Sequence, residues 1–272
     1  MGTFKRKIYS QLREWKERAG GRRALMIKGA RRVGKSTIAE EFAKKEYLSY
    51  ILIDFGQAPK RVVDLFEDLS DLNFIFLQLQ MIYKVKLVER KSVIVFDEVQ
   101  LAPKARQAIK YLVADGRYDY IETGSLIGIR KFTEGILIPS EETTIEMYPM
   151  DYEEFRWAMG DEISVPLLRQ CFDAQKTLGD AVVRQTLRDF RLYMLIGGMP
   201  QVVSEYIKTN NFVDVDEMKR SIISLYDADL RRIDSTGRAS LLFNNIPAQL
   251  SHGGGRYQVS AVIDNQRAEN IL

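Results

Sequence analysis

The chain contains very little of two residues on which many enzymes depend. Among its 272 residues there is one cysteine, Cys171, and one histidine, His252. A single cysteine excludes an internal disulfide and fits a reducing compartment, and no cysteine or histidine spacing matches a zinc site. We expect Cys171 to be a buried filler and His252, beside three glycines, to be an exposed loop residue. Catalysis by a Ser/His or Cys/His arrangement therefore has almost no material.

Long apolar runs are also missing. The most hydrophobic stretch, residues 72–88, is interrupted by glutamine and lysine, so the sequence predicts no membrane span. The amino terminus is basic but has no apolar core and is not a secretory signal. We expect a short helix there, with Ile8, Leu12 and Trp15 inside. Its cations are expected on the solvated face: Lys5, Arg6, Lys7, Arg13, Lys16 and Arg18.

A large net charge is absent as well. The net charge is +3 and the pI is about 8.8, which permits contact with nucleic acid without demonstrating it. Apolar residues make up 46% of the chain, enough for one or two domains with a substantial core. These features favour a cytoplasmic protein.

The most informative stretch is a phosphate-binding loop. Residues 29–36 read Gly-Ala-Arg-Arg-Val-Gly-Lys-Ser and satisfy the P-loop pattern G-x-x-x-x-G-K-[ST]. A chance match is the alternative, but an apolar run at 24–27 and a helical pattern at 37–47 provide the required strand and helix. We expect Lys35 to reach the β- and γ-phosphates and Ser36 to ligate Mg²⁺. The residues expected to bind the nucleotide are Gly29, Ala30, Arg31, Arg32, Val33, Gly34, Lys35, Ser36 and Thr37.

A second motif supplies carboxylates. Residues 92–96 form a β-branched apolar run, followed immediately by Asp97 and Glu98, in the form of a Walker B motif. A buried strand would deliver both acids to the carboxyl end of a parallel sheet, where ligands collect. We expect Asp97 to hold Mg²⁺ together with Ser36, and Glu98 to orient and polarise an attacking water. An ordinary acidic strand end is the alternative interpretation.

A third, weaker signal follows. Residues 118–122 are expected to form a strand that leads into Thr123-Gly124-Ser125. Small hydroxyl side chains at that strand end could reach a water near the γ-phosphate, as the sensor-one residue does in AAA-type ATPases. Ser125 and Thr123 are the candidates. A simple turn explains the same residues equally well.

With these motifs, the chain resembles prokaryotic AAA-superfamily ATPases that are related to archaeal ATPases and origin-recognition-type proteins and carry a poorly characterised carboxy-terminal domain. The stretches that carry the resemblance, in addition to the P-loop, are residues 96–100 (Phe-Asp-Glu-Val-Gln), 123–126 (Thr-Gly-Ser-Leu), 148–155 (Tyr-Pro-Met-Asp-Tyr-Glu-Glu-Phe) and 196–200 (Ile-Gly-Gly-Met-Pro). The last two are the most specific to the group. The resemblance implies ATP rather than GTP, and no Asn-Lys-x-Asp guanine motif is found.

The order of elements predicts the fold. Strands are expected at 24–27, 51–53, 92–96, 118–122 and 143–147. They alternate with helices at 37–47 and 105–113 and with a largely helical region at 62–89, which is typical of a parallel three-layer α/β sheet. Helices are expected at 152–159, 165–175, 178–196, 201–207, 217–230 and 237–251. We therefore expect a P-loop ATPase domain (1–150), an α-helical lid (151–235) and the start of a winged-helix-like domain (236–272). The chain is expected to be a truncated protein.

These motifs predict a Mg²⁺-dependent ATPase, a phosphoanhydride hydrolase that couples ATP and ADP states to a partner such as double-stranded DNA or another protein. A nucleotide-gated binding switch with little hydrolysis is the main alternative. A small-molecule kinase is a third, but it would need a lid with clustered arginines. An arginine finger could come from Arg130, Arg231 or Arg232. No residue pattern selects among them. Whether the protein forms a homo-oligomer is an open question at this point.

Overall fold

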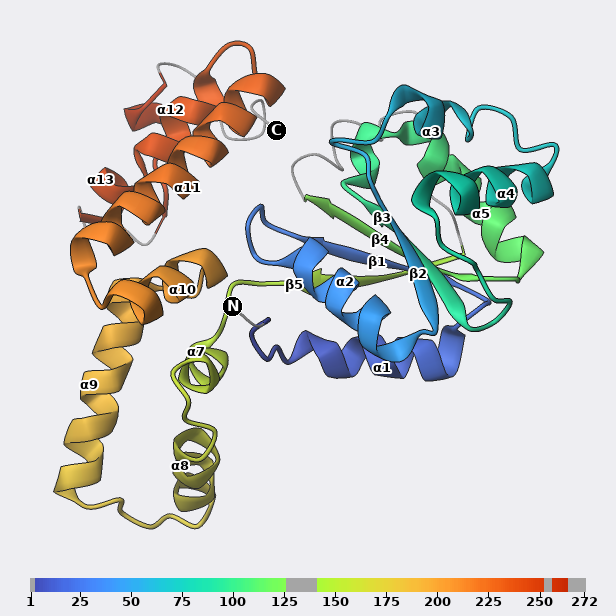
Figure 1. The fold of residues 1–272 in the computed structure, drawn as a ribbon. Coiled ribbons are helices and arrows are strands. Elements are labelled where there is room, and N and C mark those ends of the chain that lie inside the picture. Colours follow the sequence, from blue (N-terminus) through green and yellow to red (C-terminus); the bar gives the residue numbers. More distant parts are fainter. Residues whose placement is uncertain (1–2, 126–140, 252–255, 264–272) are drawn as a thin grey trace. The chain divides into compact units, whose positions relative to one another are not determined.

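The computed structural model describes residues 3–125, 141–251 and 256–263. Its centre is a five-stranded parallel sheet in the order β2-β3-β4-β1-β5, shown in Figure 1. The strands are β1 (Ala24–Gly29), β2 (Ser49–Asp54), β3 (Ser92–Asp97), β4 (Asp119–Ser125) and β5 (Glu142–Met147). All five predicted strands are confirmed. Because β1 and β3 each neighbour β4, the ends of these three strands lie next to one another at the carboxyl edge of the sheet.

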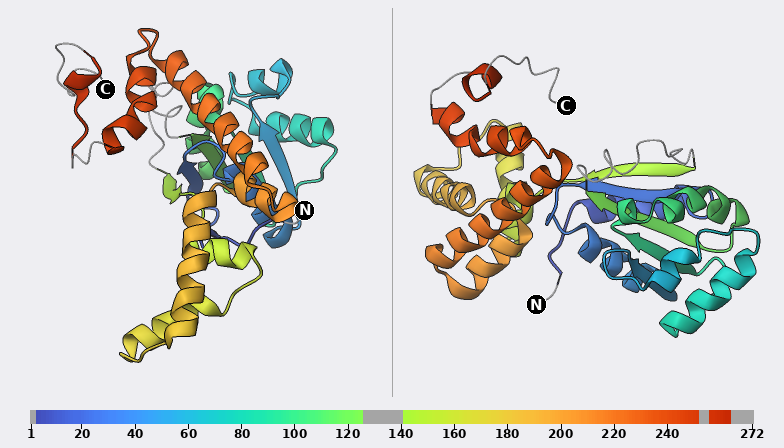
Figure 2. Two further views of the ribbon diagram at one scale, coloured as in Figure 1. Left: turned by 90° about the vertical axis from the view of Figure 1, so that its left-hand side faces the viewer. Right: turned by 90° about the horizontal axis from the view of Figure 1, so that it is seen from above.

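Helices cover both faces of the sheet, so the three-layer prediction is confirmed. The helices are α1 (Ile8–Ala19), α2 (Lys35–Glu46), α3 (Lys60–Asp64), α4 (Leu72–Tyr83) and α5 (Pro103–Asp115). Side chains alternate along each strand: Val93 and Val95 pack with α1 and α2, whereas Ile94 and Phe96 pack with α3, α4 and α5. A near-continuous apolar run such as β3 is what burial on both faces requires. Figure 2 shows the same helices from two further directions.

The region 62–89, predicted to be largely helical, contains two helices separated by a non-helical break. The chain forms the short α3 and, after a break, α4. Asp71 starts α4 by accepting a hydrogen bond from the Phe74 N–H, and the helix ends at Lys84 in a left-handed conformation. The apolar spacing continued across the break, but the capping aspartate decided where the helix begins.

Two predictions about single residues also fail. α1 buries Ile8, Leu12 and Trp15 as expected, but Arg6, placed on the solvated face by its charge, is only 7% exposed. Cys171 is not a buried filler: it is half-buried on α8 (Ser164–Asp173), a helix in which no residue is buried. His252 lies outside the described residues.

A helical region follows the sheet. It comprises α7 (Tyr152–Ala158), α8, α9 (Asp180–Ile196), α10 (Pro200–Thr209), α11 (Phe212–Ile233), α12 (Arg238–Asn244), α13 (Ile246–Ser251) and the 3₁₀ turn η2 (Val259–Ala261). Gly197, with a φ of 81°, ends α9 and Pro200 begins α10, as their residue types predict. The one helix expected over 237–251 is two, because the chain breaks at Asn245 between α12 and α13.

By internal contacts the chain forms two compact units, Met1–Asn210 and Asn211–Leu272. The second unit contains α11 and α12, which are joined by hydrogen bonds from Ser240 and Asn244 to Asp227. The finer boundaries at 150 and 235 and the winged-helix-like identity of 236–272 stay predictions. Within the described ranges, no helix is both long enough and apolar enough to cross a membrane.

A polar cluster is buried beside the sheet. Arg106 of α5 is fully buried and lies 3.0 Å from Glu142 of β5 in an ion pair. Glu122 of β4 is also fully buried, and neither of its carboxylate oxygens has a hydrogen-bond partner. Burial, reinforced by the Glu142 charge, raises the pKa of Glu122 to about 8. We therefore expect Glu122 to be largely protonated at neutral pH.

Candidate functional site

The loop between β1 and α2 has the backbone that a phosphate site requires. Gly34 caps α2 with a φ of 99°, a conformation that L side chains rarely adopt. Gly29 has another reason to lack a side chain, because a Cβ there would lie 2.2 Å from the Met147 carbonyl oxygen of β5. The helix α2 therefore begins directly after the loop. The N–H groups of its first turn and the positive end of its dipole are then available to an anion at the loop.

Lys35 lies inside this loop. Its ammonium group donates to the carbonyl oxygens of Ala30 at 2.9 Å and Gly29 at 3.2 Å, and the residue is only 4% exposed. Burial lowers the pKa of Lys35 below its ordinary value, while the carboxylates of Glu98 and Asp97 oppose that shift. A buried cation whose hydrogen bonds go to neutral carbonyls is stabilised by an anion bound beside it.

The two motifs meet at Asp97. The Ser36 hydroxyl donates to Asp97 Oδ1 at 2.7 Å, and the Thr123 hydroxyl donates to the same oxygen. Thr123 Oγ1 in turn accepts the Glu98 N–H at 3.2 Å. The ends of β3 and β4 and the first turn of α2 thus converge on one buried carboxylate. This is the juxtaposition that the sequence predicts for Ser36 and Asp97.

Glu98 and the third motif have distinct positions. Glu98 adopts a left-handed backbone conformation with a φ of 52° and is half-buried, and its carboxylate accepts a hydrogen bond from the Gln100 side-chain amide. The sequence does not predict this contact of Gln100, although the residue belongs to the 96–100 stretch. Ser125 is the last residue of β4 and pairs in register with Gly29. Of the two hydroxyl candidates, Thr123 therefore contacts Asp97, and the role of Ser125 stays a prediction.

The remaining charged candidates separate into different parts of the chain. Arg32 has a φ of 68° in the loop, an uncommon conformation for a residue with a side chain. Arg231 and Arg232 belong to α11 in the second unit, where Arg231 is ion-paired with Asp227 at 2.9 Å. Arg130 lies outside the described residues. None of the three arginine-finger candidates is singled out by these contacts.

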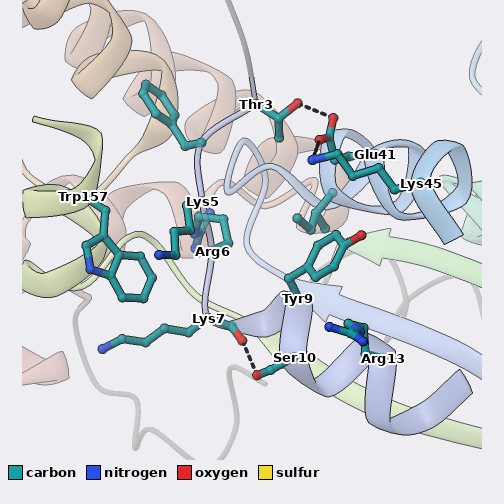
Figure 3. Close-up of a pocket in the computed structure, with 12 residues that line it drawn as sticks. Thr3, Lys5, Arg6, Lys7, Tyr9, Ser10, Arg13, Glu41, Lys45 and Trp157 are labelled. Carbon is teal, nitrogen blue, oxygen red and sulfur yellow. Dashed lines mark hydrogen bonds and ion pairs between the residues drawn. The ribbon is translucent and has the colours of Figure 1, made fainter. Parts of the chain in front are cut away.

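A pocket of about 580 Å³ borders α2. The amino-terminal segment, α1 and Trp157 of α7 line it together with Ile38 and Glu41 of α2 (Figure 3). The Lys5 ammonium lies 4.7 Å from the centre of the Trp157 ring. Sequence reasoning did not find this pocket, because its walls come from segments about 150 residues apart.

Comparison with known proteins gives a family for the first part of the chain. The model of an AAA domain matches residues 21–156, which are 136 of the 272 residues and include the phosphate loop, the carboxylates Asp97 and Glu98, and Thr123 and Ser125 of the third motif. A domain of unknown function matches residues 187–270. No curated protein matches.

Solved structures with a related arrangement have low sequence identity. PCH-2 from C. elegans is 12% identical, with 78% of this chain and 66% of that chain covered and a TM-score of 0.44. ORC1 of Aeropyrum pernix in complex with DNA is 13% identical, with 94% and 81% covered and a TM-score of 0.41. AMPPCP-bound DnaA from Aquifex aeolicus is 14% identical, with 96% and 86% covered and a TM-score of 0.42. At such values the likeness carries no information on ligand or partner.

Proposed function

The chain belongs to the AAA domain family of P-loop ATPases, and we propose that it binds ATP with Mg²⁺ and hydrolyses the bond to the terminal phosphate. The observation that carries the proposal is the convergence of Ser36 and Thr123 on one oxygen of Asp97. It brings the phosphate loop and the carboxylate motif into contact, which supports the proposal because phosphoryl transfer depends on positioning these groups around the phosphates.

The residues around Asp97 fit Mg²⁺. The carboxylate of Asp97 and the hydroxyl of Ser36 are hard oxygen ligands in direct contact. No group of three or more His, Cys, Asp or Glu residues in the described ranges could hold a metal by itself. That suits an ion which keeps waters and takes its other ligands from substrate phosphates. When bound, Mg²⁺ would offset the negative charge that develops on the phosphate oxygens.

The roles of the side chains follow from their positions. Lys35 would exchange its two carbonyl partners for phosphate oxygens, and the loop N–H groups would hold the triphosphate. Glu98 would orient a water and accept its proton as the water oxygen bonds to the γ-phosphorus. The bond from that phosphorus to the bridging oxygen would break, leaving ADP and phosphate. Thr123 would hold Glu98 and Asp97 in register through its one hydroxyl.

We further propose that the base and ribose of ATP extend into the pocket beside α2. Arg6 and Ile38 line that pocket, and Arg6 also contacts the loop at Val33. Trp157 and Tyr9 offer aromatic faces to a base there.

The proposed partner, double-stranded DNA or another protein, rests on the sequence-based predictions alone. We propose that the protein is cytoplasmic and that its helical region passes the nucleotide state to this partner. Assembly into a homo-oligomer is an open alternative. A nucleotide-gated switch with little turnover is the second candidate function. One observation favours it, namely the Gln100 amide bound to the Glu98 carboxylate, which occupies the group that hydrolysis needs.

Steady-state phosphate release from Mg-ATP tests both candidates. The variants are Lys35→Ala, Glu98→Gln and the control Lys44→Ala, which removes an exposed lysine of the same helix that pairs with Glu40. An ATPase loses turnover in the first two and keeps it in the third, while Glu98→Gln still binds ATP. Lys35-dependent binding without turnover in the wild type would support the switch instead. Adding double-stranded DNA tests that partner directly.

A further inference from the structure

Arg6 is a buried cation in contact with the phosphate loop. Its Nη1 donates to the Val33 carbonyl oxygen at 2.9 Å, and its Nη2 donates to the Tyr148 carbonyl oxygen at 2.6 Å. Its Nε lies 3.2 Å from Glu154 Oε2 in an ion pair, and both charged side chains are less than a tenth exposed. The guanidinium group therefore connects the phosphate loop, the residue that follows β5 and the helix α7.

The contact with Val33 constrains the next amide. In a planar trans peptide the carbonyl of one residue and the N–H of the next point in opposite directions, and the described chain has no cis peptide bond. Because Arg6 holds the Val33 carbonyl toward its own guanidinium group, the Gly34 N–H points to the opposite side of the peptide, away from Arg6. The same hydrogen bond polarises the peptide and makes its N–H a better donor.

We propose that Arg6 is a positioning residue for nucleotide binding, which fixes the Val33–Gly34 peptide so that the Gly34 N–H faces the phosphates. This inference rests on the proposed function. Arg6 does not touch the nucleotide phosphates in this scheme; it acts through the peptide that does.

Glu154 is the group that holds Arg6 in place. Its carboxylate accepts the Lys7 N–H at 2.6 Å and the Asp151 N–H at 3.2 Å, in addition to its ion pair with Arg6. Asp151 accepts the Glu154 N–H in return, which completes a capping box at the start of α7. With its position set by these contacts, Glu154 leaves the guanidinium little freedom, and a shift of α7 would be passed to the loop.

Two variants separate positioning from simple stabilisation. Arg6→Met alone leaves the Glu154 carboxylate buried without its cation, so a loss of stability is expected whatever the role of Arg6. The double variant Arg6→Met with Glu154→Gln removes both charges and should recover most of the melting temperature. Arg6→Lys keeps a positive charge beside Glu154, but one ammonium group cannot reproduce the fork that reaches both carbonyls. Arg18→Met is the control, because this arginine is exposed and its ion pair is with Glu14 on the surface of the same helix.

The amide itself can be observed. Val33-Gly34 is the one Val-Gly dipeptide in the sequence, so a protein labelled with carbonyl-¹³C valine and ¹⁵N glycine gives a single Val-to-Gly correlation by NMR. In the wild type we expect a downfield shift of the Gly34 amide proton on saturation with Mg-ATP. Calorimetric titration of Mg-ATP into the same samples measures the Kd.

We expect the Kd for ATP to be about tenfold weaker in the folded double variant and in Arg6→Lys, a difference of about 1.4 kcal/mol in binding free energy. The shift of the Gly34 amide proton at saturation should also be smaller in these variants. Arg18→Met should match the wild type. If the double variant or Arg6→Lys binds ATP with the wild-type Kd and shift, Arg6 only stabilises the fold and the inference is overturned. A wild-type protein that binds no ATP would overturn the proposed function instead. That outcome differs from ATP binding that depends on Lys35 but is unaffected by substitution of Arg6, which would overturn this inference alone.

Discussion

Replacing Thr123 by valine tests the link between the two carboxylates. Thr123 is fully buried, and its one hydroxyl both donates to Asp97 and accepts the Glu98 N–H. Valine has nearly the same shape but can do neither, so Asp97 loses a donor and the Glu98 amide loses its acceptor. The side chain leaves no cavity, which restricts the effect to these two hydrogen bonds.

The magnitude follows from the partners. A hydrogen bond to a charged group contributes about 1.5–3 kcal/mol and a neutral one about 0.5–1.5 kcal/mol, so Thr123→Val should lower the free energy of unfolding by about 2–4.5 kcal/mol. Thr123→Ser keeps the hydroxyl and loses one buried methyl group, at a cost of about 1 kcal/mol. Because the lost hydroxyl holds Glu98, we expect the valine variant to lower kcat at least tenfold with a smaller change in the Kd for ATP.

Urea unfolding and steady-state phosphate release on the wild type and both variants provide the measurement. The valine variant must be less stable than the serine variant and slower in turnover. Equal losses in the two variants would refute the reasoning, since the methyl group and not the hydroxyl would then be responsible. A valine variant with normal kcat would show that Thr123 does not hold Glu98 for catalysis.

Three further predictions follow from buried and aromatic groups. First, burial lowers the pKa of Lys35 in the free protein, and bound phosphates would raise it. At a pH between the two pKa values, ATP binding should therefore be accompanied by uptake of a proton. Calorimetry in buffers of different ionisation enthalpy should detect this uptake at alkaline pH, and Lys35→Arg should abolish it. Second, burial raises the pKa of Glu122 to about 8 in the folded protein, from 4.5 for an ordinary glutamate in the unfolded chain. The folded state therefore binds more protons between these two values, and the free energy of unfolding should fall by up to about 1.4 kcal/mol per pH unit from pH 4.5 to 8. Glu122→Gln should flatten this slope in urea unfolding; an unchanged slope would assign it to other groups. Third, Trp15→Phe leaves Trp157 as the single tryptophan, and its fluorescence should change on adding ATP but not on adding inorganic triphosphate if the base enters the pocket beside α2.

Much of the site could be predicted because its signals are local. The loop needs glycine at two positions, one for a left-handed backbone conformation and one for the close approach of a neighbouring strand. The carboxylates follow directly on a β-branched run. Both motifs can therefore be recognised within a few residues of sequence. That Ser36 and Asp97 meet could also be expected, since strand ends gather at one edge of a parallel sheet. What could not be expected is which hydroxyl of the third motif reaches Asp97, because Thr123 and Ser125 share a side of the strand and differ only in depth.

Helix boundaries show the limits of periodicity. The apolar spacing across residues 62–89 is compatible with one helix, yet the Asp71 side chain starts α4 at a defined point. Likewise, the charge of Arg6 predicts exposure, since an isolated arginine is rarely buried. Its burial depends on acceptors from Val33, Tyr148 and Glu154, the last about 150 residues away in the chain.

The strand-loop-helix of the phosphate site, the carboxylates of the second motif and the parallel three-layer sheet can be predicted from residue type and from spacing within one or two elements. The contact of Arg6 with the loop, the hydrogen bond from Gln100 to Glu98 and the pocket between the amino-terminal segment and α7 become visible in the folded chain. Those features arise from packing between distant segments, where burial and available hydrogen-bond partners, rather than the properties of one side chain, set the lowest free energy.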